Sequence, residues 1–349
     1  MHGRWWLLCL FVAIPATALA DEDPSAPTST EILLASSEER GAAVSGGPAI
    51  PPPKPEERDE NRAPQYRAWG YFNRPINGQP ARLGFVKQEF STPIPLWICD
   101  TDILAASVLV RNFHFQSGAQ LPEIGSRFPK DLWDIRLGLN YFHTFDNGWK
   151  FGLMPRLGSP SDKPFASIRE MNLGATSFLR MPAERDGDFW TVSLSYFPNS
   201  QLAFPLPGGT YEWNPSDRLK IGLGLPFSFT WKPTDEVRFD FNYTPLTLVT
   251  ARASWNPKPV WKLYTGFDWD NEGYFLAGRA DRRDLFFFYE KRLCVGTRID
   301  LGERCAVDFS GGYAFDREFG SGRSPINFTS NQVKIESGAF ISGWLLAFF

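Results

Sequence analysis

The chain has 349 residues, and its 36 Lys and Arg residues nearly balance its 39 Asp and Glu residues, which gives a formal net charge of -3. This balance provides no clustered basic face, so a nucleic acid is excluded as the expected partner. Mean hydropathy is also below zero, at -0.27, and no run after Ala20 has the length and apolarity of a membrane-spanning helix.

The first twenty residues predict a secretory signal peptide, 1–20. Arg4 supplies a positive start, Trp5–Ile14 forms an apolar core, and Ala18-Leu19-Ala20 forms a small-residue cleavage site. We therefore expect export to the periplasm, with cleavage after Ala20. A retained membrane anchor is the alternative, although Pro15 breaks the apolar run and leaves it short for a spanning helix.

Residues 21–79 have a different composition, dominated by Ser, Ala, Pro, Glu and Gly. Pro51-Pro52-Pro53-Lys54-Pro55 precedes the charged run from Glu56 to Arg62. Such a segment cannot bury enough apolar surface to order itself. The sequence predicts a disordered periplasmic arm over 21–79 and a barrel domain over 80–349.

Strand signals repeat from about Ala81 to the end, and the clearest lies in Arg218–Lys232. Large apolar residues occupy every odd position from Leu219 to Trp231, whereas the even positions are charged, small or polar. A side-chain period of two indicates a strand with one apolar face. Soluble strands usually have about 5–6 residues and membrane-spanning strands about 9–11, so this run predicts one long transmembrane strand.

Similar signals elsewhere predict an all-β, antiparallel, up-and-down transmembrane barrel. The count is about twelve strands, with ten or fourteen left open, and an even number is typical of bacterial single-chain barrels. The other expected strands are Ala81–Phe90, Ile103–Phe115, Asp131–Phe145, Trp149–Leu157, Ala166–Met181, Asp188–Phe197, Val237–Trp255, Trp261–Asp270, Leu285–Leu301, Cys305–Phe315 and Val333–Phe349.

Aromatic residues on the apolar faces favour a membrane barrel over a soluble sandwich, in which they would simply form the core. Trp133 and Tyr141 stand eight residues apart, as do Trp261 and Trp269. Eight residues advance roughly 26 Å along a strand, which after tilting matches two interfacial girdles around an apolar band. The candidate girdle residues are Trp133, Tyr141, Trp149, Trp231, Trp261 and Trp269.

The chain ends in Trp344-Leu345-Leu346-Ala347-Phe348-Phe349. A C-terminal strand that finishes on Phe resembles the signal that outer-membrane barrels present to their insertion machinery. We expect this machinery and outer-membrane lipid as partners, and the outer membrane as the location. Counting strands back from Phe349 places most long loops outside, but it puts the long stretch Pro198–Pro215 on the periplasmic side. Either the strand count is wrong there, or this segment folds into the lumen.

The polar faces of the expected strands carry charges of both signs. In a water-filled pore such residues set ion selectivity, whereas in a small barrel they form salt bridges that fill the interior. Both outcomes stay open. The candidate lumen-lining residues are Asp134, Arg136, Lys150, Arg156, Arg218, Lys220, Arg238, Asp240, Lys262, Asp268, Asp270, Glu290, Arg292, Arg298, Asp300 and Asp308.

No segment predicts catalysis, a cofactor or a metal. His143 precedes Asn147-Gly148 much as in the outer-membrane phospholipase, but Phe145 stands where that enzyme carries its Ser nucleophile. Thr144 points to the opposite face of a regular strand from His143. Gly222 and Gly224 lie inside a strand, so they are not a nucleotide-binding fingerprint.

Three cysteines remain after signal cleavage: Cys99, Cys294 and Cys305. They have no metal-site spacing. The alternation places Cys294 inward and Cys305 outward, which argues against that pair. A bridge from Cys99 to either of them is left open.

Residues from about Asp131 to Gly320 resemble a family of uncharacterised outer-membrane β-barrel proteins of Gram-negative-type bacteria. The resemblance implies a barrel in the outer membrane, carries over no functional residue, and implies nothing about substrate. The motifs that carry it are Ser161-Asp162-Lys163-Pro164-Phe165, Pro205-Leu206-Pro207-Gly208-Gly209-Thr210-Tyr211, Asn214-Pro215-Ser216-Asp217, Trp231-Lys232-Pro233-Thr234-Asp235 and Gly312-Tyr313-Ala314-Phe315-Asp316-Arg317.

The sequence thus leads to an outer-membrane protein that is not an enzyme. The first expectation is a porin-like channel for passive diffusion of small polar solutes. The alternative is a closed structural or adhesion barrel whose loops bind an envelope or external partner. A lipid-modifying enzyme is a distant third.

Overall fold

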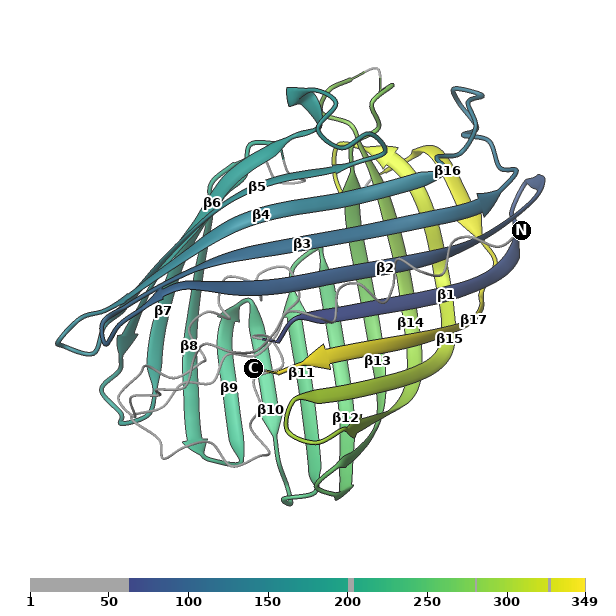
Figure 1. Cartoon of the computed structure of the whole chain (residues 1–349). Coiled ribbons are helices and arrows are strands. Elements are labelled where there is room, and N and C mark those ends of the chain that lie inside the picture. The colour runs from purple at the N-terminus through teal and green to yellow at the C-terminus, as the bar shows by residue number, and fades with distance from the viewer. Residues whose placement is uncertain (1–62, 200–203, 280, 326–327, 349) are drawn as a thin grey trace.

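The computed structural model describes residues 63–199, 204–279, 281–325 and 328–348, which form one antiparallel sheet closed into a barrel (Figure 1). The expected signal peptide, residues 21–62 of the expected arm, and Phe349 lie outside the described residues. Within the described ranges, no helix is long and apolar enough to cross a membrane.

The barrel closes because the first strand pairs with both the second and the last strand. In chain order the strands are β1 (Gln65–Ile76), β2 (Gln79–Ile98), β3 (Asp102–Ser117), β4 (Asp131–Thr144), β5 (Lys150–Ser161), β6 (Asn172–Pro182), β7 (Phe189–Tyr196), β8 (Leu206–Ser216), β9 (Leu219–Leu225), β10 (Phe227–Trp231), β11 (Val237–Thr244), β12 (Leu248–Lys258), β13 (Trp261–Tyr274), β14 (Leu285–Asp300), β15 (Cys305–Gly322), β16 (Ser330–Ile335) and β17 (Gly338–Ala347).

The expected count of about twelve strands is wrong, because the barrel has 16 strands and one extra strand. Two stretches expected to be single strands, Arg218–Lys232 and Val237–Trp255, are hairpins. The segment expected to be a long loop, Pro198–Pro215, contains all but the last residue of β8. β1 lies within residues assigned to the arm, so the barrel begins before residue 80.

The hairpin in Arg218–Lys232 keeps its alternation through the turn. Ser228 pairs with Gly222, and Thr230 pairs with Lys220, so even-numbered residues face even-numbered residues across the two strands. Paired residues of antiparallel strands point to the same face, so the pattern runs on as if the strand were continuous. The turn is marked by Gly224, with a φ of 151°, and by Pro226, which has no amide hydrogen for a strand ladder.

The corrected count resolves the position of the long loops. β1 begins and β17 ends at one end of the barrel, since Gln65 pairs with Leu346; we call this the terminal end and the other the loop end. The connections at the terminal end include the short turns 217–218, 259–260 and 301–304. The loop end carries the longer connections 118–130, 162–171, 197–205, 275–284 and 323–329.

β16 and β17 share one position in the barrel. Both pair with β15: β16 at Arg317–Ser321 and β17 at Cys305–Ala314. A register shift in β15 around Asp316, whose φ is 52°, separates these two ladders. The bulge changes the inward phase of β15 from even to odd residues, so that Arg317 and Phe319 are buried.

The wall of the barrel varies greatly in height. β2, β3, β14 and β15 have 20, 16, 16 and 18 residues, whereas β9, β10 and β11 have 7, 5 and 8. Strand length falls gradually between these two sides, which Figure 1 shows as long strands around β2 and short ones at β9 and β10. We call β1–β5 with β13–β17 the tall half, and β6–β12 the short half.

The outer surface is apolar, as the alternation predicts. Leu293, Val295, Phe309 and Ile341 on the tall half are 54–65% exposed, although all four are large apolar residues. Leu194, Leu223 and Leu225 repeat this on the short half. An apolar face of this extent is unusual for a protein surrounded by water.

Candidate functional site

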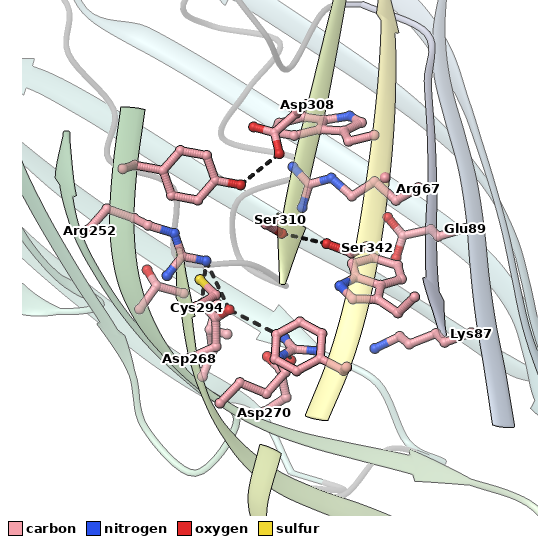
Figure 2. A pocket seen from close by; sticks show the side chains of 18 of the residues that line it. Arg67, Lys87, Glu89, Arg252, Asp268, Asp270, Cys294, Asp308, Ser310 and Ser342 are labelled. Carbon is pink, nitrogen blue, oxygen red and sulfur yellow. Dashed lines mark hydrogen bonds and ion pairs between the residues drawn. The ribbon is translucent and has the colours of Figure 1, made fainter. Parts of the chain in front are cut away.

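A cavity of about 350 Å³ with charged walls lies inside the barrel, lined mainly by the tall half and also by β11 and β12 of the short half (Figure 2). Seven of the predicted lumen-lining residues contribute to it: Asp240, Lys262, Asp268, Asp270, Arg292, Arg298 and Asp308. Six further charged residues were not predicted and come mostly from β1, β2 and β3, whose strand signals are weak: Arg67, Lys87, Glu89, Arg111, Arg252 and Glu272.

The remaining predicted residues lie elsewhere. Asp134 is buried and pairs with Arg136, with 2.7 Å between nitrogen and oxygen. Glu290 is fully buried beneath the cavity wall. Lys150, Arg156, Lys220 and Arg238 follow the inward phase of β5, β9 and β11 but do not line the cavity. Two residues lie at the terminal end: Arg218, exposed and paired with Asp235, and Asp300, paired with Arg298.

Arg292 is the centre of the charge network on β13 and β14. Its guanidinium group contacts Asp270, lies 2.9 Å from Glu290 and 3.5 Å from Asp268. Arg252 of β12 donates to both oxygens of Asp268, at 2.7 and 2.8 Å. The pairs of Arg292 and Arg252 with Asp268 and Asp270 join neighbouring strands, as Figure 2 shows for Arg252 and Asp268. Together with the Arg292–Glu290 pair within β14, they compensate charges that burial would otherwise make costly.

A second set of ion pairs spans the lumen. Glu272 of β13 accepts from Lys87 of β2 and, at 2.9 Å, from Arg111 of β3. Arg111 also contacts Glu89, at 2.8 Å. β14, β15, β17 and β1 separate these strands around the barrel, so the contacts cross the interior.

Aromatic side chains fill the tall half toward the loop end. Phe288 of β14 contacts Phe85 and Phe113, with ring centroids 5.6 and 5.3 Å apart, and Phe113 lies 5.7 Å from Tyr274. The aromatic members of this cluster, which we call the aromatic plug, are Tyr71, Phe85, Phe113, Phe115, Phe128, Tyr274, Phe286, Phe288, Phe319 and Phe340.

Two loops meet over the barrel at the loop end. The amide of Phe275 donates to the carbonyl of Pro160 at 2.7 Å, and the amide of Ala277 donates to the Asp162 carboxylate at 2.8 Å. Arg279 pairs with Glu170 of the short 3-10 helix Ile168–Glu170 at 3.5 Å. These contacts hold the loop after β5 against the loop after β13. Because β5 and β13 are the strands of the tall half that border the short half, the two loops separate the opening of the tall half from that of the short half.

The inner face of the short half has a different character, because small and neutral polar residues dominate it. Arg180 pairs there with Glu212 at 2.7 Å and Arg238 with Asp240 at 2.7 Å, while Arg252 of β12 pairs with Asp268 of the neighbouring β13. The neutral polar and small residues on this face include Thr176, Thr191, Ser193, Ser195, Gly208, Thr210, Gly222, Ser228, Thr230, Asn242, Thr250 and Ser254, and its large apolar residues include Phe178, Phe189 and Leu248.

The predicted girdle residues divide between the two ends. Tyr141, Trp149, Trp231 and Trp261 lie toward the terminal end, and Trp133 and Trp269 toward the loop end. Trp149, Trp231 and Trp261 are 39–44% exposed. Their interfacial role stays a prediction.

The two histidines in the described residues acquire acidic partners that sequence proximity did not suggest. His143 lies 2.8 Å from Asp102, which also accepts from Tyr141, and His114 lies 2.8 Å from Asp131. Within the described part of the chain, no hydrogen bond from either imidazole to a Ser, Thr or Cys side chain is present. Cys99, Cys294 and Cys305 are free thiols, and Cys294 faces the cavity.

No family model matches the chain, and no curated protein is significantly similar to it. Among solved structures, the COG4313 outer membrane channel from Pseudomonas putida F1 is 10% identical over 86% of this chain and 100% of that chain, with a TM-score of 0.36. The β domain of the Bordetella autotransporter BrkA is 13% identical over 82% and 99%, with a TM-score of 0.30.

The outer membrane phospholipase A from Escherichia coli is 12% identical, and the match covers 81% of this chain and 92% of that chain, with a TM-score of 0.27. The first and the third of these proteins are described as outer-membrane proteins. At these scores the matches carry no argument about function, so the site rests on its own geometry.

Proposed function

We propose that the protein is an outer-membrane barrel through which small polar solutes diffuse passively along the short half of the lumen. The contrast between the two halves carries this proposal. The aromatic plug and the ion pairs of Glu272 cross the tall half. On the inner face of the short half, hydroxyls, amides and glycines outnumber the charged residues.

Size and surface support the same function. A barrel of about sixteen strands has room for an aqueous channel, whereas about eight strands are filled by side chains. An apolar outer surface with aromatic residues toward both ends is the surface that a membrane barrel presents to lipid. The tall half then acts as a rigid support for the channel.

Single-channel conductance in a planar bilayer tests the proposal. Ser193→Trp and Thr230→Trp place bulky rings on the inner face of the short half, and both should reduce the conductance step. Val192→Trp, on the outward face beside Ser193, is the matched control and should leave it unchanged. A folded protein that gives no current, or tryptophan variants that conduct as the parent does, would refute a channel along the short half.

The ion pairs across the lumen favour a second candidate, a closed barrel that presents its loops to an envelope or external partner. The contacts among the loops 162–171 and 275–284 hold such a surface in place. Absence of current from a protein shown to be folded would support this candidate.

A further inference from the structure

The wall at β9 and β10 is too low to cross an apolar membrane layer. At about 3.3 Å per residue and a tilt near 45°, a strand of seven residues rises roughly 16 Å, and one of five residues roughly 12 Å. The apolar band around such barrels is about 25 Å tall. Trp231, a candidate girdle residue, lies at the terminal end of this hairpin. The wall therefore reaches one edge of the apolar band at the terminal end and falls short of the other edge at the loop end.

The top of this hairpin has an apolar outer side and a small, polar inner side. Leu223 and Leu225 point outward and are 48% and 53% exposed. Ser228 and Gly222 pair with each other on the inward face. A Cβ at Gly222 would lie 2.4 Å from the Ser228 hydroxyl, so side chains are packed closely along this edge and no large group stands on it.

We propose that the β9–β10 edge is a side entrance at which an amphiphilic lipid places its polar head in the lumen while its chains stay in the membrane. This inference rests on the proposed membrane location, and it adds a second class of ligand to the proposed channel. The lipid chains meet Leu223 and Leu225, and the head group meets the hydroxyl-rich inner face.

The inner face of the short half also indicates the charge of that head group. Its neutral residues include Thr210, Ser228 and Thr230. Of its charged residues, Arg180 pairs with Glu212, Arg238 pairs with Asp240, and Arg252 pairs with Asp268 of β13, while Lys220 lies opposite Thr230. The inward-facing residues at the edge itself, Thr210, Gly222 and Ser228, are uncharged, and two of them offer hydroxyl groups to a head group. A zwitterionic or uncharged head group, able to hydrogen-bond with hydroxyls, is therefore the expected occupant.

Photo-crosslinking tests this entrance directly. A photoreactive phenylalanine analogue replaces one residue at a time in the full chain, which is reconstituted in equimolar phosphatidylethanolamine and phosphatidylglycerol. Ser228 is the test position, Ser310 on the inner face of the tall half is the matched inward control, and Leu293 is the lipid-facing control. Adducts are identified by mass spectrometry after folding has been checked by heat-modifiable mobility.

We expect Ser228 to be labelled about as strongly as Leu293, with phosphatidylethanolamine favoured, and Ser310 to be unlabelled. Labelling of Leu293 without labelling of Ser228 would overturn the side entrance. A bilayer that becomes thinner around a closed wall at β9 and β10 would give this same result. Preferential labelling by phosphatidylglycerol would overturn the assigned head group.

A lengthened hairpin separates this inference from the channel itself. Adding one inward and one outward residue to each strand, between Gly222 and Ser228, raises the wall without changing the alternation. Lipid labelling at Ser228 should fall while conductance persists. Conductance without labelling in the parent protein would remove only the side entrance, whereas labelling without conductance would remove only the channel.

Discussion

At the residue scale, Glu272 joins the two sides of the tall half. Its carboxylate accepts from Lys87 and Arg111, and from the Tyr274 hydroxyl at 2.7 Å. Lys87 is 3% exposed and Arg111 9%, so neither cation has much water as an alternative partner. The carboxylate therefore compensates two cations from strands on the far side of the lumen.

Replacing Glu272 with Gln should destabilise the barrel substantially. Removing one partner of a buried pair typically costs about 3–5 kcal/mol, because the remaining charge stays uncompensated. Denaturant unfolding in detergent measures the loss. Asp316→Asn is the matched control, since its pair with Lys291 is largely exposed and such pairs contribute about 0–1 kcal/mol. Equal effects of the two variants would contradict the role of Glu272.

Asp281, in the loop 275–284, predicts a pH dependence of the loop surface. The backbone amide of Arg283 holds the pKa of the Asp281 carboxyl below its ordinary value of 3.8; burial opposes this, and Arg323 and Arg283 add to it. Because this pKa is lowered, the ion pair between Asp281 and Arg323 is fully present when the pH is above the ordinary pKa of the carboxyl. The pair is lost as the pH falls through the lowered pKa.

The amide hydrogen exchange of residues 281–284 and 323–325 should therefore become faster as the pH falls below the ordinary pKa of Asp281. The intrinsic pH dependence of exchange is subtracted first. Asp281→Asn should remove the transition and leave these residues at one level of protection. A transition that survives in this variant would assign the titration to another group.

At the element scale, the side-chain alternation decides which substitutions the barrel tolerates. Val295 of β14 is 65% exposed on the outward face, whereas Ser310 of β15 lines the cavity. The difference follows from the opposite direction of successive side chains along a strand.

Val295→Arg should lower the free energy of unfolding by about 2–4 kcal/mol, because it places a charge against lipid near the middle of the membrane. Ser310→Arg should be better tolerated, since the new side chain enters a cavity that already holds charges of both signs. Folding into lipid vesicles, followed by denaturant titration, compares the two. Equal tolerance would contradict a lipid-facing outer surface.

At the scale of the whole molecule, the aromatic plug packs the interior of the tall half toward the loop end. Phe288 is fully buried and contacts Phe85, Phe113 and, at 4.6 Å between ring centroids, Phe319. These residues come from β2 and β3 and from β14 and β15, two pairs of strands that are not neighbours in the barrel wall. The plug therefore stabilises the barrel in the way that a soluble core stabilises a domain.

Phe288→Ala should lower the free energy of unfolding by about 3–5 kcal/mol, the usual loss for a buried aromatic residue. The conductance of the folded variant should stay at the parent level, since the proposed path runs through the short half. A larger conductance step would show that current also passes through the tall half, and that the plug limits it.

The sequence indicated part of the site but not its organisation. Arg292 and Asp268 could be assigned to the lumen because β13 and β14 are long and regularly alternating. Arg67, Lys87 and Arg111 were missed, since β1 adjoins a Pro-rich segment and the strand signals of β2 and β3 are weak. Arg317 was also out of reach, because the bulge at Asp316 shifts the inward phase of β15.

What the sequence determined by itself is strand character and the identity of the two faces. Both are local, because a period of two is visible within a few residues. Only the tertiary structure decided how many strands there are. In the hairpins at 218–232 and 237–255, even residues pair with even residues, so the alternation passes through each turn unchanged. Only barrel closure placed Glu272 opposite Lys87 and Arg111, because contacts across the lumen depend on strand number and stagger, which no local pattern contains.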